Sequence, residues 1–220
     1  MSKPKNWPEA LPYLSSPLLH KALSTSQIQL LKNKPSIATA AESYLSSPIP
    51  IVPTPSCQTP SPLVKIQPIH DANHPANGQY GLFAARDLKP GTFIIPYLGR
   101  VHPGTAEATD PDSDYDLWLD HDANLAVDAS KEGNEARFVN DYRGVRERPN
   151  AEFGTAWCER WGQLCVGFWV LDAGKAKPSG KGKGDRARQQ GIKKGEEILV
   201  SYGKGFWGER MTTQEDNITK

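Results

Sequence analysis

Short apolar runs separated by glycine-bearing turns fill this chain from residue 63 onward. The runs lie at 81–84, 92–98, 115–119, 125–127, 164–171 and 198–202. None of them belongs to a long 3.6-residue period, and strands of this length between irregular loops are typical of β domains. The alternation of strands and helices that a dinucleotide-binding fold requires is absent. The pattern predicts a mostly β domain with one short helix near residues 130–139.

Glycine and proline divide the chain into two unlike parts. None of the 19 glycines precedes Gly78, whereas 11 of the 19 prolines lie within residues 1–62. The residues after 62 are numerous enough to bury one substantial core. We therefore expect an N-terminal extension with short helices, a Pro-rich linker, one β domain and a C-terminal tail. The expected limits are 1–47, 48–65, 66–207 and 208–220.

The net charge of +1 is a cancellation between unlike regions. Lysines and arginines minus acidic residues give 5 − 2 = +3 in residues 1–62, 10 − 17 = −7 in 63–174, and 11 − 6 = +5 in 175–220. Eight acidic residues and no lysine or arginine lie between Val101 and Ser130. Such a stretch would attract a basic peptide, although a solvated loop is an equally good interpretation.

Two short helical patterns survive among the prolines of the extension. Ser24 and Gln27 have capping-box spacing ahead of Ile28, which predicts a helix start. Apolar residues at i, i+3, i+4, i+7 and i+8 predict a second helix over residues 36–45, whose apolar face must dock on the domain or on a partner. Residues 46–62 contain six prolines, which is typical of a polyproline-like spacer or, alternatively, of a motif for a proline-binding module.

The sequence lacks the patterns of membrane-spanning, secreted and metal-binding proteins. No apolar run reaches the roughly 20 residues that span a bilayer, and the N-terminus has no apolar secretory signal, so we expect an intracellular protein without a membrane contact. The three cysteines, Cys57, Cys158 and Cys165, cannot form a disulfide framework, and we expect the last two to be buried structural residues. The histidines lack metal-ligand spacing, so no metal site is expected.

Three blocks then resemble, in order and spacing, the SET domain of protein lysine methyltransferases. The first is GQYGLFAARDLKPGTFIIPYLGRV, residues 78–101, which is similar to the family's opening strand pair and its glycine-rich turn beside S-adenosylmethionine. The third is GIKKGEEILVSYGKGFW, residues 191–207, which matches a Gly-Glu-Glu-Leu followed by Tyr-Gly. The resemblance covers about residues 66–207 and implies small β-sheets with a knot-like C-terminal crossing.

The second block carries the most specific match. It is VDASKEGNEARFVNDYRGVRERPNAEF, residues 127–153, with Gly-Asn, Ala-Arg-Phe-x-Asn and Pro-Asn in the family's order. One departure is clear: where the family usually reads Asn-His-Ser-Cys, this chain has Asn140-Asp141-Tyr142-Arg143, and the following zinc-binding cysteines are absent. A backbone contact to the adenine can survive at Asp141.

The resemblance implies roles for individual residues. Tyr202 would be catalytic, and Tyr115 would flank the substrate lysine with it. The residues implied to bind S-adenosylmethionine are Gly78, Gln79, Tyr80, Gly81, Arg137, Phe138, Asn140, Asp141 and Tyr202. Val200 stands where the family often has a Phe or Tyr that helps set the number of methyl groups added, so the product state stays open.

Methyl transfer to lysine places particular demands on such a site. A free lysine is almost entirely protonated at pH 7, and desolvation beside a positive sulfonium favours the neutral amine that reacts. Positioning is therefore the main requirement, and no strong general base is needed. A tyrosine hydroxyl with backbone carbonyls can orient the amine and hold the methyl by weak carbon-donor hydrogen bonds.

The resulting hypothesis is a protein-lysine N-methyltransferase that uses S-adenosylmethionine on a basic protein such as a histone, in the nucleus rather than the cytoplasm. The departure at Asp141 motivates an alternative, a SET-fold binding module with weak or no catalysis. A basic insertion at 175–190, with six basic residues and one acidic residue in 175–188, could contact nucleic acid or carry a nuclear-import signal, although a solvated loop is the commoner case.

Overall fold

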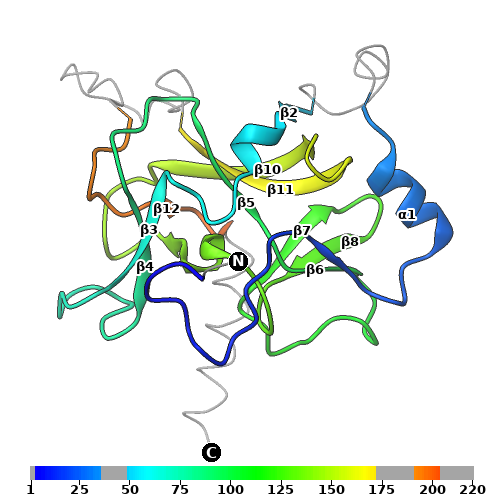
Figure 1. The fold of residues 1–220 in the computed structure, drawn as a ribbon. Coiled ribbons are helices and arrows are strands. Elements are labelled where there is room, and N and C mark those ends of the chain that lie inside the picture. The colour runs from blue at the N-terminus through cyan, green and yellow to red at the C-terminus, as the bar shows by residue number, and fades with distance from the viewer. Residues whose placement is uncertain (1–2, 36–48, 172–190, 204–220) are drawn as a thin grey trace, which may run out of the picture.

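The computed structural model describes residues 3–35, 49–171 and 191–203, drawn as a coloured ribbon in Figure 1. In chain order the elements are β1 (Leu18–Leu19), α1 (Thr25–Lys32), β2 (Ile51–Val52), the 3-10 helix η2 (Thr54–Cys57), β3 (Val64–Pro68), β4 (Tyr80–Ala84), β5 (Phe93–Tyr97), β6 (Arg100–Pro103), β7 (Asp116–Asp120), β8 (Leu125–Asp128), the 3-10 helix η3 (Glu135–Phe138), β9 (Asn140–Asp141), β10 (Ala151–Cys158), β11 (Gln163–Val170) and β12 (Leu199–Val200). The predicted mostly β fold is confirmed.

The strands form two four-stranded sheets and two small pairs. One sheet has the order β1-β6-β8-β7 and the other β2-β10-β11-β5, while β3 pairs with β4 and β12 with β9. In Figure 1 the β10–β11 hairpin crosses the top of the molecule, the β6–β8–β7 sheet lies to the right and the β3–β4 pair to the left. Most buried apolar side chains of the described residues form one cluster between these layers.

Two of the three predicted helices fall within the described residues, and both are present as helices. Helix α1 begins after Ser24, whose hydroxyl accepts the Gln27 N–H at 3.2 Å while the Gln27 side chain accepts the Ser24 N–H at 3.1 Å. This is the capping box that the spacing predicts. The helix near residues 130–139 is a single 3-10 turn, η3. The second predicted helix, over residues 36–45, lies outside the described residues.

The described part of the N-terminal extension belongs to the core of the domain. Strand β1 pairs in parallel with β6, and Tyr13 forms a bridge with Gly133. Trp7 and Leu31 are buried in the main apolar cluster. The hydroxyl of Tyr13 donates to Oε2 of the buried Glu135 at 2.9 Å, which ties the extension to the central motif.

The proline-rich segment is not a detached spacer where the structure describes it. Strand β2 adds to the edge of the β10–β11 sheet, because Ile51 and Val52 pair in parallel with Trp157 and Cys158. Cys57 is fully buried behind it, and the Ser61 N–H donates to Glu135 Oε1 at 2.9 Å. Apolar residues between the prolines therefore bury themselves on the domain. The domain limits themselves stay a prediction.

The cysteines are buried, as expected for Cys158 and Cys165, but they are also joined to each other. These two form a disulfide across the β10–β11 pair, which the sequence did not predict, and Cys57 is a buried free thiol beside Cys158. Within residues 3–35, 49–171 and 191–203, no helix has the length and apolar character to cross a membrane. The basic insertion and the tail beyond residue 203 lie outside the described residues.

Candidate active site

The C-terminal segment 191–203 carries Tyr202 across the middle of the domain. Ile192 bridges to Leu88, and Glu197 bridges to Phe83 on β4. Strand β12 then pairs in parallel with β9, with Leu199 opposite Asn140 and Val200 opposite Asp141. The two motifs that the sequence singled out, 61 positions apart at Asp141 and Tyr202, are thereby brought into direct contact.

Asn150 holds this crossing in place. Its Nδ2 donates to the Glu197 carbonyl at 2.7 Å, and its Oδ1 accepts the Leu199 N–H at 2.8 Å. The Asn150 N–H also donates to the Leu199 carbonyl at 3.0 Å. Because the residue is 3% exposed, all of these bonds form away from water, where an unmade hydrogen bond is costly. The asparagine of the Pro-Asn in the central motif therefore fixes the strand β12 that precedes Tyr202.

The Tyr202 side chain is partly buried, and its phenol is protonated at neutral pH. Its hydroxyl donates to the Val139 carbonyl at 2.6 Å. Burial raises the pKa of this hydroxyl well above its usual range, and Asp141 and Tyr115 raise it further. Tyr202 is therefore a phenol whose oxygen still offers lone pairs, and it is no source of a phenolate base.

Tyr115 is held both at its ring and at its main chain. The guanidinium carbon of Arg137 stands 4.1 Å from the centre of the Tyr115 ring, in cation–π contact. The Tyr97 hydroxyl donates to the Tyr115 carbonyl at 2.6 Å. Arg137 is itself fixed by its Nε, which donates to the Ala129 carbonyl at 3.0 Å. Of the predicted residues, Tyr115 and Arg137 are therefore in direct contact.

The side chain of Asp141 turns toward Tyr202. Its Oδ2 accepts the Tyr202 backbone N–H at 2.7 Å and the Arg143 guanidinium at 2.8 Å. Its Oδ1 accepts the Arg143 N–H at 2.8 Å. The Tyr142 N–H donates to the Val200 carbonyl at 2.9 Å. In a parallel ladder this bonding leaves the backbone groups of Asp141 itself pointing away from β12, so they can serve a ligand.

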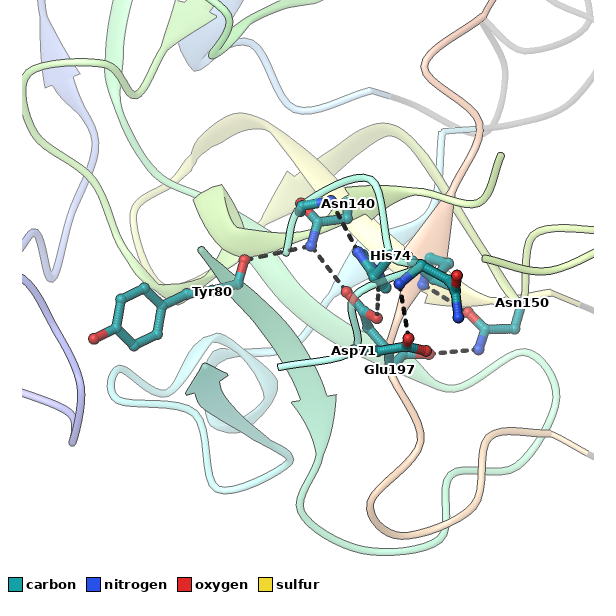
Figure 2. Close-up of polar contacts among 9 residues, drawn as sticks. Asp71, His74, Tyr80, Asn140, Asn150 and Glu197 are labelled. Atoms are coloured by element: carbon teal, nitrogen blue, oxygen red, sulfur yellow. Dashed lines mark hydrogen bonds and ion pairs between the residues drawn. The ribbon is translucent and has the colours of Figure 1, made fainter. Parts of the chain in front are cut away.

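Asn140 is the centre of a second group of predicted residues, shown in Figure 2. Its Nδ2 donates to Glu197 Oε1 at 2.8 Å and to the Tyr80 carbonyl at 3.3 Å. Both of these partners are acceptors, so the atom that faces them must be the amide nitrogen. Asn140 therefore presents its Oδ1, an acceptor, on its remaining side.

The glycine-rich turn lies beside Asn140 on β4 and the loop before it. Gly78 has φ +81°, and its N–H donates to the Ile69 carbonyl at 3.0 Å, while Gln79 donates to the Ala76 carbonyl at 3.0 Å. Gly81 is needed for space, because a Cβ there would lie 2.5 Å from Glu197 Oε1. Tyr80 is 40% exposed. Figure 2 shows that the Tyr80 carbonyl faces Asn140, whereas the exposed Tyr80 ring points away from it.

Phe138 is the predicted site residue whose side chain belongs to the core. Its ring packs edge-on against Tyr80, with centroids 6.1 Å apart, and against Trp7, with centroids 5.8 Å apart. The residue is 9% exposed. Phe138 thus supports Tyr80 from behind.

Two further residues are candidates for the site, although the sequence assigns a role to neither. Glu197 belongs to the segment that matches Gly-Glu-Glu-Leu, and no motif includes His74. In the structure the His74 Nε2 lies 3.0 Å from Glu197 Oε2, and both side chains are buried. Local sequence patterns cannot indicate this pair, because the two residues lie 123 positions apart.

About half of the acidic stretch serves the fold of the chain itself. The carboxylates that accept hydrogen bonds within the domain include those of Asp110, Asp116, Asp120 and Asp128. Glu107, Asp112 and Asp122 are exposed. The stretch is therefore partly structural and partly a surface available to a basic partner.

Comparison with solved structures returns chains of polycomb repressive complex 2. The complex from Chaetomium thermophilum is 23% identical with a TM-score of 0.46, covering 66% of this chain and 16% of that chain. A ctPRC2 in an autoinhibited conformation bound to S-adenosylmethionine is 22% identical with a TM-score of 0.45, covering 71% and 17%. An active polycomb repressive complex 2 in the stimulated state is 24% identical with a TM-score of 0.39, covering 57% and 14%. This chain thus spans about a sixth of those chains.

Comparison with curated protein sequences gives no match. The family assignment rests instead on a family model. The model of the SET domain matches residues 79–203, which is more than half of the 220 residues and contains Gly81, the central motif and Tyr202. On that match, the chain belongs to the SET domain family.

Proposed function

We propose that this protein transfers a methyl group from S-adenosylmethionine to a lysine side chain of a basic protein, such as a histone. The observation that carries the proposal is the placement of Tyr202 beside the parallel pair of β9 and β12, with its backbone N–H bonded to Asp141 and its hydroxyl bonded to the Val139 carbonyl. Membership of the SET domain family supports it, since most of the recognised motif residues converge on this crossing.

The residues around Asn140 fit S-adenosylmethionine by their chemistry. The cofactor carries hydrogen-bond donors, namely an ammonium group, ribose hydroxyls and the adenine amine. The Asn140 Oδ1 is an acceptor whose orientation is fixed by Glu197 and Tyr80. The Tyr80 ring offers an exposed aromatic surface, and the backbone of Asp141 is turned away from β12.

The reaction requires little acid–base chemistry from the protein. S-adenosylmethionine, when bound, would supply a sulfonium methyl for transfer to a neutral lysine amine, with S-adenosylhomocysteine as the second product and one lysine proton released to solvent. Tyr202 remains protonated, so it orients the amine through its oxygen and does not abstract a proton. Tyr115, held by Arg137, forms an aromatic wall that excludes water and favours the uncharged amine.

A basic substrate is favoured by the exposed part of the acidic stretch. Glu107, Asp112 and Asp122 are exposed in the segment that contains Tyr115. Charges of this kind accelerate and orient the approach of an oppositely charged peptide. Nucleic-acid contact through residues 175–188 and a nuclear location remain proposals from the sequence.

A second candidate function is a SET-fold binding module with little catalysis. It is favoured by the departure from the family's central motif, where Asp141, Tyr142 and Arg143 replace the usual His-Ser-Cys. Calorimetry with S-adenosylmethionine distinguishes the two functions. Clear binding supports the enzyme, and absence of binding by the folded protein supports the module.

The test of the enzyme is labelled methyl transfer to a panel of histones and other basic proteins, with Tyr202→Phe as the variant. We expect its single-turnover rate to fall roughly 100-fold, as when one preorganised polar group is removed from an active site. Its affinity for the cofactor should stay close to that of the wild type. Tyr13→Phe is the matched control, because it removes a buried hydroxyl from the Glu135 network. Equal labelling by the wild type and Tyr202→Phe would contradict the role of Tyr202.

A further inference from the structure

His74 lies in the loop between β3 and β4, which is held by its own backbone. The His74 N–H donates to the Asp71 carbonyl at 3.1 Å, and the Asn77 N–H donates to the His74 carbonyl at 2.9 Å. The Asp71 side chain caps the same turn by accepting the Asn73 N–H at 2.9 Å. The loop therefore presents His74 from a fixed turn toward Glu197, as Figure 2 shows.

The hydrogen bonds of the ring fix its tautomer. The His74 Nδ1 accepts the Ala76 N–H at 3.0 Å, so the ring proton lies on Nε2. That Nε2–H donates to Glu197 Oε2 at 3.0 Å. His74 therefore acts as a directed donor to one oxygen of this carboxylate.

Glu197 is held at both of its oxygens. Oε2 accepts from His74, and Oε1 accepts from the Asn140 amide at 2.8 Å. The side chain is 9% exposed, so water does little to replace a lost donor. The carboxylate occupies space that is free only because residue 81 is glycine, since a Cβ there would collide with Oε1.

We propose that His74 is a positioning residue of the candidate cofactor site, acting through Glu197 to keep the Asn140 Oδ1 directed toward the cofactor. The inference rests on the proposed function. Without the His74 donor, the Glu197 carboxylate is free to rotate, and the Asn140 amide loses its fixed partner. The Asn140 acceptor would then be oriented only by the longer bond to the Tyr80 carbonyl.

Calorimetry with S-adenosylhomocysteine measures the effect directly. We expect His74→Leu to weaken binding about tenfold, the loss that corresponds to one hydrogen bond to a charged group. His74→Gln should bind within about threefold of the wild type, since its amide nitrogen takes the place of Nε2. His74→Asn, with its nitrogen nearer to the backbone, should bind as weakly as His74→Leu. His70→Leu, which changes an exposed histidine of the same loop, should bind as the wild type.

A double-mutant cycle with Asn140→Ala separates positioning from general destabilisation. If His74 acts through the Asn140 amide, His74→Leu should change the affinity less than about twofold in the Asn140→Ala background. An equal loss in both backgrounds, or no loss in the wild-type background, would overturn the role of His74. If His74→Leu does not fold, the contrast between His74→Gln and His74→Asn decides. Failure of the folded wild type to bind overturns the proposed function instead.

Discussion

The Asp141 carboxylate accepts the backbone N–H of Tyr202 at 2.7 Å, so the residue that replaces the family's usual histidine fixes the main chain of the predicted catalytic tyrosine. Arg143 holds the same carboxylate through its backbone N–H and its guanidinium. The side chain is 6% exposed. The departure from the family pattern therefore has a structural use at the site.

Asp141→Ala should lower methyl transfer more than it lowers cofactor affinity. The change leaves the Tyr202 N–H without its charged acceptor, a loss of about 1.5–3 kcal/mol, which corresponds to roughly 10- to 100-fold in rate. Single-turnover labelling and calorimetry on the same preparation measure the two effects. Asp87→Asn, which alters an exposed acidic residue paired with Lys193, serves as the control. A parallel loss of rate and affinity would argue against this role of Asp141.

Gly81→Ala should reduce both cofactor affinity and stability. A methyl group at this position would lie 2.5 Å from Glu197 Oε1 and 3.0 Å from the Phe83 ring, so the carboxylate must leave Asn140. Overpacking of this kind costs about 1–3 kcal/mol. Gly154→Ala is the matched control, because a Cβ on this strand glycine meets no atom within 4 Å. Urea unfolding and calorimetry should both separate the two variants, and equal behaviour would contradict the packing argument.

His102 should make the domain more stable at acid than at alkaline pH. Its Nδ1 lies 3.0 Å from the Pro103 carbonyl and its Nε2 3.1 Å from Asp116 Oδ1, and only the doubly protonated ring donates to both. The hydrogen bond to Asp116 raises the pKa of His102, burial opposes the shift, and the Pro103 carbonyl and the charges of Asp116 and Asp128 add to it. A raised pKa means that the folded state binds the proton more tightly than the unfolded state.

The sign of the effect sets the pH window. The stabilisation is complete below the unfolded pKa of about 6.5 and is lost as the pH rises through the higher pKa of the folded state. The free energy of unfolding of the wild type should therefore exceed that of His102→Gln by more at pH 5.5 than at pH 9, as measured by urea titration. A difference that does not vary with pH would show that His102 does not titrate as the structure indicates.

The contiguous motifs were the part of the site that could be predicted from sequence. Asn140 and Tyr202 lie in blocks whose residue order is distinctive, and the apolar runs indicated the position of several strands. The sequence pattern does not reveal strand β10, because polar residues and Gly154 interrupt its apolar residues and four successive positions, 152–155, are only half-buried. A strand of that kind has no two-residue alternation to detect.

The partners of long-range polar contacts could not be predicted. His74 and Glu197 lie 123 positions apart, and Tyr13 and Glu135 lie 122 apart. Local patterns indicate which face of an element is apolar, but they do not specify which distant side chain will meet a buried carboxylate. The same limit explains why the proline-rich segment is typical of a spacer in sequence, although its Ile51 and Val52 pair with Trp157 and Cys158 of β10, 157 − 51 = 106 positions later.

The pairing of β9 with β12 has a consequence for how the protein reaches its active form. Each strand contributes two residues, and Asp141 meets Tyr202 only after the intervening chain has closed a long loop. Closure of this kind is slow compared with the formation of hairpins such as β10–β11. We therefore expect cofactor binding to appear last during refolding, after most of the tryptophan fluorescence has recovered. The recovery of cofactor binding would then mark the end of folding.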